Sequence, residues 1–149
     1  MTAKEKKAHD YFYGGCNCAQ SVFAAFHEEM GLGEGLALQL MAPMGGGVGG
    51  MREICGAVSG AAMALNMAQG GIERGNREQK ERLYAQVQAL AEKFKAEYTT
   101  VNCGRLLELN DLQPSPVPAV RDAKYYEERP CGKYVETCAR LVEEELRKG

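Results

Sequence analysis

A run of glycines that leads directly into a helix of small residues is the feature that most limits how this chain can fold. The run covers residues 45–50, and it must be a loop because glycine weakens helices and enters left-handed turns freely. A helix is expected to follow at 53–68, where Gly56, Gly60 and Ala64 recur at every fourth residue. Such residues share one helix face, and a face without side chains lets another helix backbone approach closely.

Glycines, prolines and apolar periodicity divide the rest of the chain into further helices. The clearest is expected at 77–98, where Leu83, Val87, Leu90, Phe94 and Tyr98 follow helical spacing. The other expected helices cover residues 2–12, 17–31, 35–41, 103–109 and 131–147.

The segment 110–130 contains four prolines and is expected to be an extended surface loop. No segment alternates polar and apolar residues as a strand does. The sequence therefore predicts an all-α protein with one domain over residues 1–149. This domain is expected to be a bundle of about five to six helices with a Gly-rich and a Pro-rich loop.

Charge and hydropathy exclude several classes of function. The net charge is -2 and the sequence pI is about 5.8, which argues against nucleic acid as a partner because phosphate binding needs a basic face. No uncharged stretch is long and apolar enough to span a bilayer, and no apolar core of a signal peptide follows the N-terminal lysines. We therefore expect a cytoplasmic protein that does not span a membrane. In that compartment clustered cysteines are more often catalytic or metal-binding than structural disulfides.

Four of the six cysteines stand where helices are expected to begin. Cys18 follows the good N-cap residue Asn17, Cys103 follows Asn102, Cys131 follows Pro130, and Cys55 opens the helix after the glycine loop. The N-terminus of a helix stabilises negative charge and so favours the thiolate, which attacks disulfides and binds metals. These positions predict that the four thiols share one site, and that Cys55 in particular has a lowered pKa.

The remaining two cysteines are expected to play other roles. Cys138 falls on the apolar face of the last helix and is expected to be buried in the core. Cys16 forms a C-x-C pair with Cys18 but precedes its helix, and its role stays open.

The glycine run also matches a loose nucleotide-binding pattern, G-x-G-x-x-G, at Gly45, Gly47 and Gly50. A dinucleotide site requires a strand before this pattern, whereas the preceding residues look helical. The run is therefore interpreted as a tight connection whose backbone N–H groups can face a small anion or a sulfur atom.

These residues together resemble a known family. The segments GGCNCAQSVFAAF, GGGVGGMREICGAVSGAAMAL, NCGRLLELN and PCGKYVETCARLVEE are similar to the C-GCAxxG-C-C family of redox-active proteins, over nearly the whole chain. The resemblance implies that the family's four characteristic cysteines are Cys18, Cys55, Cys103 and Cys131. It also implies that the glycine-rich approach and the small helix face complete the motif, so that a cofactor would contact Gly47, Gly49, Gly50, Gly56, Ala57 and Gly60.

Three interpretations of the four thiols remain open. They form a redox site, which either cycles between dithiol and disulfide or holds an iron–sulfur cluster for electron transfer. Alternatively they form a structural zinc site, although the usual short C-x₂-C pairs are absent. In the third interpretation the chain is a helical interaction module with inert cysteines. A redox site implies a partner protein that exchanges electrons with it, and assembly into a homo-oligomer is left open.

Overall fold

The computed structural model describes residues 1–148 and is built of helices only. Its elements are α1 (Ala3–Tyr13), α2 (Cys18–Ala24), α3 (His27–Met30), α4 (Glu34–Met41), the short 3-10 helix η1 (Ala42–Met44), α5 (Gly56–Ala68), α6 (Arg77–Tyr98), α7 (Cys103–Glu108), α8 (Ala123–Glu128) and α9 (Cys131–Lys148). The described residues contain no strand, and only an isolated bridge joins Ile54 to Asn102. The all-α prediction is therefore confirmed, with more and shorter helices than expected.

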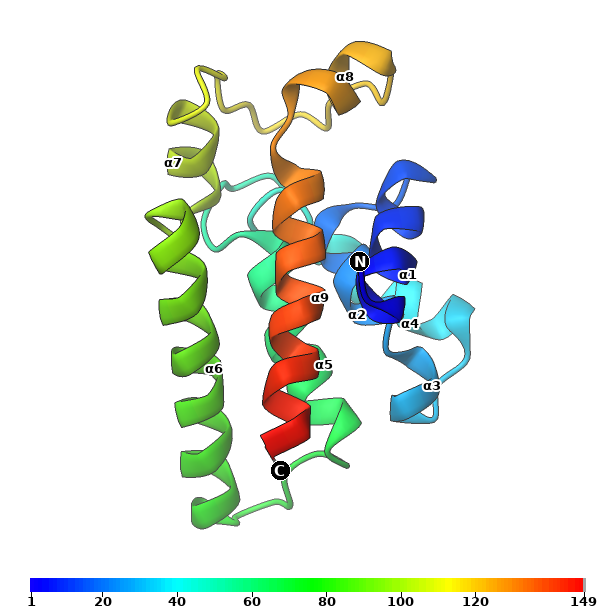
Figure 1. Ribbon diagram of the computed structural model, residues 1–149, viewed down its shortest axis with the longest axis vertical. Helices are drawn as coiled ribbons and strands as arrows, with labels where there is room; N and C mark the ends of the chain where they lie inside the picture. Colours follow the sequence, from blue (N-terminus) through cyan, green and yellow to red (C-terminus); the bar gives the residue numbers. More distant parts are fainter. Residues whose placement is uncertain (149) are drawn as a thin grey trace.

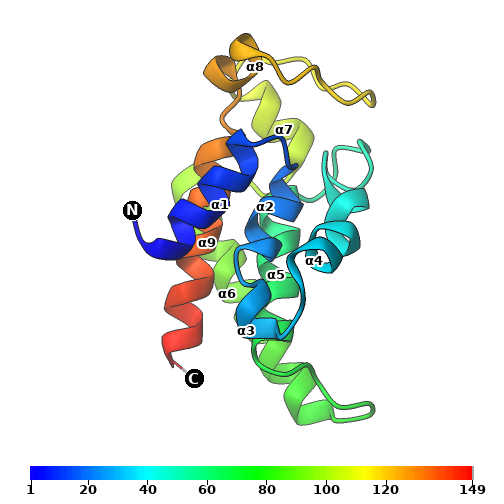
Figure 2. The ribbon, with the colours of Figure 1, turned by 90° about the vertical axis from the view of Figure 1, so that its right-hand side faces the viewer.

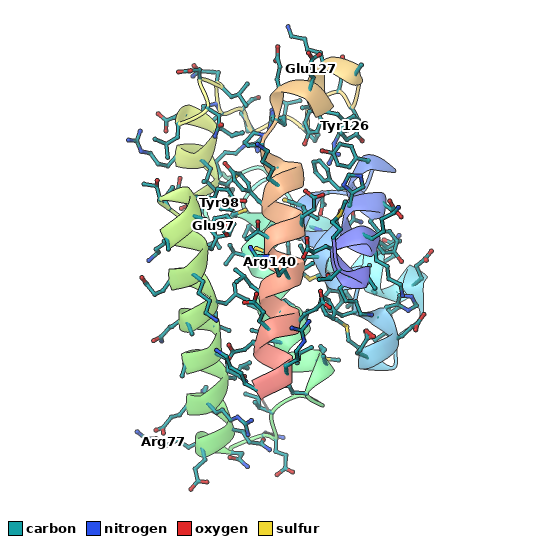
Figure 3. The ribbon with its side chains drawn as sticks, viewed as in Figure 1. Arg77, Glu97, Tyr98, Tyr126, Glu127 and Arg140 are labelled. Atoms are coloured by element: carbon teal, nitrogen blue, oxygen red, sulfur yellow. The ribbon has the colours of Figure 1, made fainter. Side chains whose placement is uncertain are left out.

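Helix α9 is the central element of the bundle. It contacts α1, α2, α5 and α6, and in Figure 1 it stands between α6 on one side and the group of α1, α2 and α4 on the other. Its buried face includes Val135, Cys138 and Val142, all fully inaccessible to solvent. An ion pair between Arg140 of α9 and Glu97 of α6 lies at the edge of this contact (Figure 3).

The predicted close approach occurs between α2 and α5, which pack together more extensively than any other pair of helices. A Cβ atom added at Gly60 would lie 2.6 Å from the backbone oxygen of Ala19 in α2. A Cβ atom added at Gly56 would collide with the Sγ atom of Cys18. The small residues thus bring the start of α2, with its cysteine, directly against the start of α5.

The structure differs from the sequence-based expectation at residues 17–31 and 110–130, among others. The helix expected at 17–31 is interrupted between α2 and α3, where Lys4 donates a hydrogen bond of 3.1 Å to the backbone oxygen of Ala25. This carbonyl oxygen therefore accepts a hydrogen bond from a side chain of another helix. The segment 110–130 is not extended throughout, because Asp122 caps α8 by accepting a hydrogen bond from the backbone N–H of Tyr125.

Helix α8 and the Pro-rich segment before it lie at the end of the molecule where α9 begins (Figures 1 and 2). None of the helices described for residues 1–148 is sufficiently long and apolar to cross a bilayer.

Candidate functional site

Four cysteines from four parts of the chain line one cavity. Cys18, Cys103 and Cys131 are the first residues of α2, α7 and α9, and Cys55 is the N-cap residue of α5. The cavity has a volume of about 60 Å³, and the side chains of all four line it. The structure thus brings together the four thiols that the sequence placed at helix starts.

Side-chain caps position two of these cysteines. Asn17 accepts a hydrogen bond from the backbone N–H of Gln20, while Gln20 accepts one from the backbone N–H of Asn17, forming a capping box around Cys18. Asn102 caps α7 by accepting a hydrogen bond from the backbone N–H of Arg105. Each cap fixes the first turn of its helix and hence the direction of the thiol in it.

Backbone hydrogen bonds tie the segment before α5 to the segment before α7. The N–H of Cys55 donates to the oxygen of Val101 at 2.7 Å, and the N–H of Cys103 donates to the oxygen of Glu53 at 2.5 Å. Residues 53–55 are therefore engaged with 101–103 instead of forming the first turn of a helix. The helix expected at 53–68 consequently begins only at Gly56.

The glycine loop, of which Gly46 lines the cavity, has a left-handed conformation. Gly46, Gly47, Gly49 and Gly50 all have positive φ angles, as does Val48 between them. A Cβ atom at Gly47 would lie 2.7 Å from the Cβ atom of Cys103, so no other residue fits there without displacing that cysteine.

The small residues expected to contact a cofactor have different positions. Gly56 lines the thiol cavity, whereas Gly49 and Gly50 line a larger groove beside it. Gly47, Ala57 and Gly60 line neither of the two and are close-packed against neighbouring chain. Because they are close-packed, these three residues help to set the positions of the thiols.

Burial controls the ionisation of three of the thiols. Burial, together with the neighbouring Cys18, raises the pKa of Cys131 to about 12. Burial also raises the pKa of Cys18, with a further contribution from Cys103, whereas the backbone N–H groups of Gly46 and Ala19 lower it.

The expectation of a lowered pKa at Cys55 is wrong. Burial raises the pKa of Cys55 well above its ordinary value, and the nearby Cys18 and Cys138 raise it further. The thiol is 4% exposed, so the desolvation of a thiolate there outweighs the attraction of the helix N-terminus. Cys55 is consequently a neutral thiol at physiological pH.

Cys103 contacts a cation. Like Cys18 and Cys131 it is partly buried, and the guanidinium Nη1 of Arg52 lies 3.6 Å from its Sγ atom. A cation beside a sulfur atom pairs with the thiolate, the form that attacks disulfides.

Four further polar residues at the site were not singled out from the sequence. They are Arg52, Arg121, Tyr125 and Arg129, which line the thiol cavity. Two of them could have been identified from their nearness to a cysteine in the sequence, because Arg52 stands three residues before Cys55 and Arg129 stands two before Cys131. Arg121 and Tyr125 could not have been, because they come from the segment interpreted as a plain loop.

The two remaining cysteines lie outside the cavity lining. Cys138 is fully buried on α9, as expected, and burial raises its pKa well above the ordinary value. Cys16 is partly buried, and its backbone oxygen accepts a hydrogen bond of 3.0 Å from Arg121.

Four cysteine sulfurs are the ligands that bind an iron–sulfur cluster or a structural zinc ion, but in this structure they are not arranged to hold one. Among residues 1–148 no three Cys, His, Asp or Glu side chains are grouped so that they could hold a metal ion. Bringing three or more of these side chains onto one ion or cluster would therefore require the helix starts to move.

Comparison with known proteins gives one match. A family model described as "Putative redox-active protein (C_GCAxxG_C_C)" matches residues 16–145, which include all six cysteines. This chain belongs to the C_GCAxxG_C_C family. The match confirms the resemblance drawn from the four cysteine segments, and it identifies a redox-active protein without specifying a substrate or cofactor. No curated protein and no solved structure matches the chain.

The raised pKa of Cys131 predicts a loss of stability at alkaline pH for this member of the C_GCAxxG_C_C family. An unfolded cysteine has a pKa of about 8.5, whereas the folded value is about 12. The contribution to stability is fully present below the unfolded pKa and is lost as the pH rises towards the folded value. Between these values it falls by about 1.4 kcal/mol per pH unit.

Urea unfolding of the reduced protein between pH 8 and pH 10.5 measures this effect. Because serine does not ionise in this range, the Cys131→Ser variant should lose stability with a shallower slope than the wild type. Equal slopes for the two proteins would contradict the assignment of a buried, neutral thiol at position 131.

Proposed function

We propose that this protein is a thiol–disulfide redox protein whose four-cysteine cavity exchanges electrons with a disulfide. The observation that carries the proposal is that Cys18, Cys55, Cys103 and Cys131 line one cavity although they are far apart in the sequence. All are free thiols in the structure, and all lie within the region that matches the redox-active family. On this proposal the whole chain forms a single redox domain.

Cys103 is proposed as the attacking thiol because it is accessible and has Arg52 beside its sulfur. Its thiolate attacks one sulfur of a substrate disulfide, the substrate S–S bond breaks, and the departing thiolate takes a proton. The product is a mixed disulfide between the substrate and Cys103.

Cys18 is proposed as the second thiol of the pair. Cys18 lines the same cavity as Cys103, and Cys103 is the neighbouring thiol that raises the pKa of Cys18 most. The Cys18 sulfur attacks the Cys103 sulfur, the mixed disulfide breaks, and a second substrate thiolate leaves and is protonated. The two protein thiols have then lost two electrons and two protons, and the substrate disulfide has gained them.

A reductant must return the protein to the dithiol state, and a dithiol partner protein is proposed for this role. Cys55 is buried, burial raises the pKa of both Cys55 and Cys131, and their neutral thiols are poor nucleophiles. They are proposed to act after Cys18 as a second pair: by two exchange steps a Cys55–Cys131 disulfide forms, the Cys18–Cys103 disulfide breaks, and the two protons of Cys55 and Cys131 pass to the regenerated thiols.

The proposal is tested on protein purified without oxygen. Visible absorption and the iron and zinc contents are measured first, followed by alkylation and mass spectrometry across a series of glutathione redox buffers. We expect no stoichiometric metal, and we expect Cys18 and Cys103 to lose and regain reactivity together in a two-electron transition.

Each alternative interpretation of the four thiols predicts a different result in this experiment. Charge-transfer bands together with bound iron would contradict the proposal and indicate an iron–sulfur cluster held by the same four cysteines. Stoichiometric zinc in a colourless sample would replace it with the structural site. A metal-free protein whose thiols never pair would leave a helical interaction module.

A further inference from the structure

A groove of about 320 Å³ opens beside the thiol cavity. The two share part of their lining, namely Asn17, Gly46, Arg52, Arg121, Tyr125 and Arg129. Helix α8 and the residues before it form one wall of this groove, and the glycine loop forms another. Its volume falls in the range of small-molecule sites, about 300 to 1,000 Å³. A molecule in the groove is therefore in contact with residues that also surround the sulfur atoms.

The groove carries positive charge that no carboxylate neutralises. Arg52, Arg121 and Arg129 all line it, and no Asp or Glu lines either cavity. Within the part of the chain that the structure describes, none of the three forms an ion pair, whereas Arg77, Arg140 and Arg147 do.

Neutral groups hold the guanidinium groups of Arg121 and Arg52 in place. Arg121 is stacked on the rings of Phe12 and Tyr125, 4.7 and 4.5 Å from their centroids, and donates to the backbone oxygen of Cys16. The Nε of Arg52 donates to the backbone oxygen of Ser115 at 2.8 Å. Aromatic and carbonyl partners fix the guanidinium groups but leave their charges uncompensated.

Arg129 is the least engaged of the three. Its guanidinium group lies 5.0 Å from the ring centroid of Tyr125 and donates no hydrogen bond to any described residue. An arginine has five N–H donors, and their fork matches a carboxylate. A half-buried arginine with all of its donors free is suited to bind an anion from solution.

We infer that the substrate is a small disulfide that carries carboxylate groups, bound through Arg129, Arg121 and Arg52 so that its S–S bond lies at Cys103. The inference rests on the proposed thiol–disulfide function and specifies its substrate class. The guanidinium groups take the carboxylates, and Arg52, which also contacts the Cys103 sulfur, connects the groove to the thiol. Electrons and protons balance as in the exchange described above, with two substrate thiols released for each protein disulfide formed.

Three small disulfides that differ in charge test this inference. Reduced protein is mixed with dithiodiglycolate, which is anionic, with 2-hydroxyethyl disulfide, which is neutral, and with cystamine, which is cationic. Each rate of thiol loss is divided by the rate for the same compound with dithiothreitol, which removes differences in intrinsic reactivity. We expect the anionic compound to react about tenfold faster than the neutral one at low salt, and we expect this preference to shrink at high salt.

The variants Arg129→Gln and Arg105→Gln form a matched pair. Both remove one positive charge, but Arg105 is exposed on α7 and lines neither cavity. Arg129→Gln should lose most of the preference for the anionic disulfide over the neutral one. Arg105→Gln should keep the preference.

A binding measurement separates the groove from the chemistry. Adipate has the length of dithiodiglycolate but a CH₂–CH₂ unit in place of the S–S bond, and calorimetry should detect its binding to the wild type and its loss in Arg129→Gln. Equal normalised rates for the three disulfides, without adipate binding, would overturn the inference and leave the thiol chemistry standing. Failure of all three disulfides to react would overturn the proposed function and the substrate assignment, and adipate binding would then report an anion site alone.

Discussion

Replacing Cys18 with serine is expected to abolish formation of the protein disulfide and to stop the reaction at the mixed disulfide on Cys103. The second attack requires a thiol already held beside the first, and its loss should slow release of the second substrate thiol by at least about 100-fold. Mass spectrometry of the variant after treatment with 2-hydroxyethyl disulfide should find one hydroxyethylthio group on Cys103.

Cys16→Ser is the matched control for this result. Cys16 lies only two residues away from Cys18 but does not line the cavity. Its variant should therefore form the disulfide at the rate of the wild type. If Cys18→Ser instead formed an intramolecular disulfide as fast as the wild type, another cysteine would be the partner of Cys103.

Gly60→Leu is expected to give the largest loss of stability of any single substitution considered, about 3 kcal/mol or more. Even the first atom of the new side chain would lie 2.6 Å from the backbone oxygen of Ala19, and that oxygen cannot move without shifting α2. Gly60→Ala tests the same contact with one added atom. It should destabilise the protein even though alanine is favoured over glycine in a helix by about 1 kcal/mol.

Gly35→Ala is the control for the alanine variant. Gly35 is exposed in α4, and an added Cβ would meet nothing within 4 Å. This substitution should raise the free energy of unfolding by up to about 1 kcal/mol. Urea unfolding of the two alanine variants should give changes of opposite sign. Stabilisation by Gly60→Ala would mean that α2 and α5 do not approach each other at this residue.

Much of the local structure followed from the sequence because it depends on neighbouring residues. Asn17 and Asn102 have side chains that cap the turn three residues ahead, so the helix starts at Cys18 and Cys103 were predictable. The apolar spacing of Leu90 and Phe94 placed both on the buried face of α6. Gly60 marked a close approach because the absence of a side chain has a direct steric meaning.

Other local features depended on distant residues and were missed. The break between α2 and α3 involves Lys4, which contacts Ala25 from another helix. Helix α5 begins after Cys55, not before it, because residues 53–55 bond to the segment before α7. Asp122 is a favourable N-cap residue for α8, but the prolines around it led the segment to be interpreted as a loop.

The sequence by itself determined which residues are available for chemistry, and the tertiary structure decided how they behave. Four thiols at helix starts could be identified from caps and glycines, and the structure gathers them around one cavity. Their ionisation could not be inferred in the same way, because the helix terminus acts locally whereas desolvation depends on everything packed around the sulfur. At Cys55 that packing outweighs the helix terminus. The arginine groove is likewise a tertiary feature, since Arg52, Arg121 and Arg129 come from three separate segments and share a site only after the chain has folded.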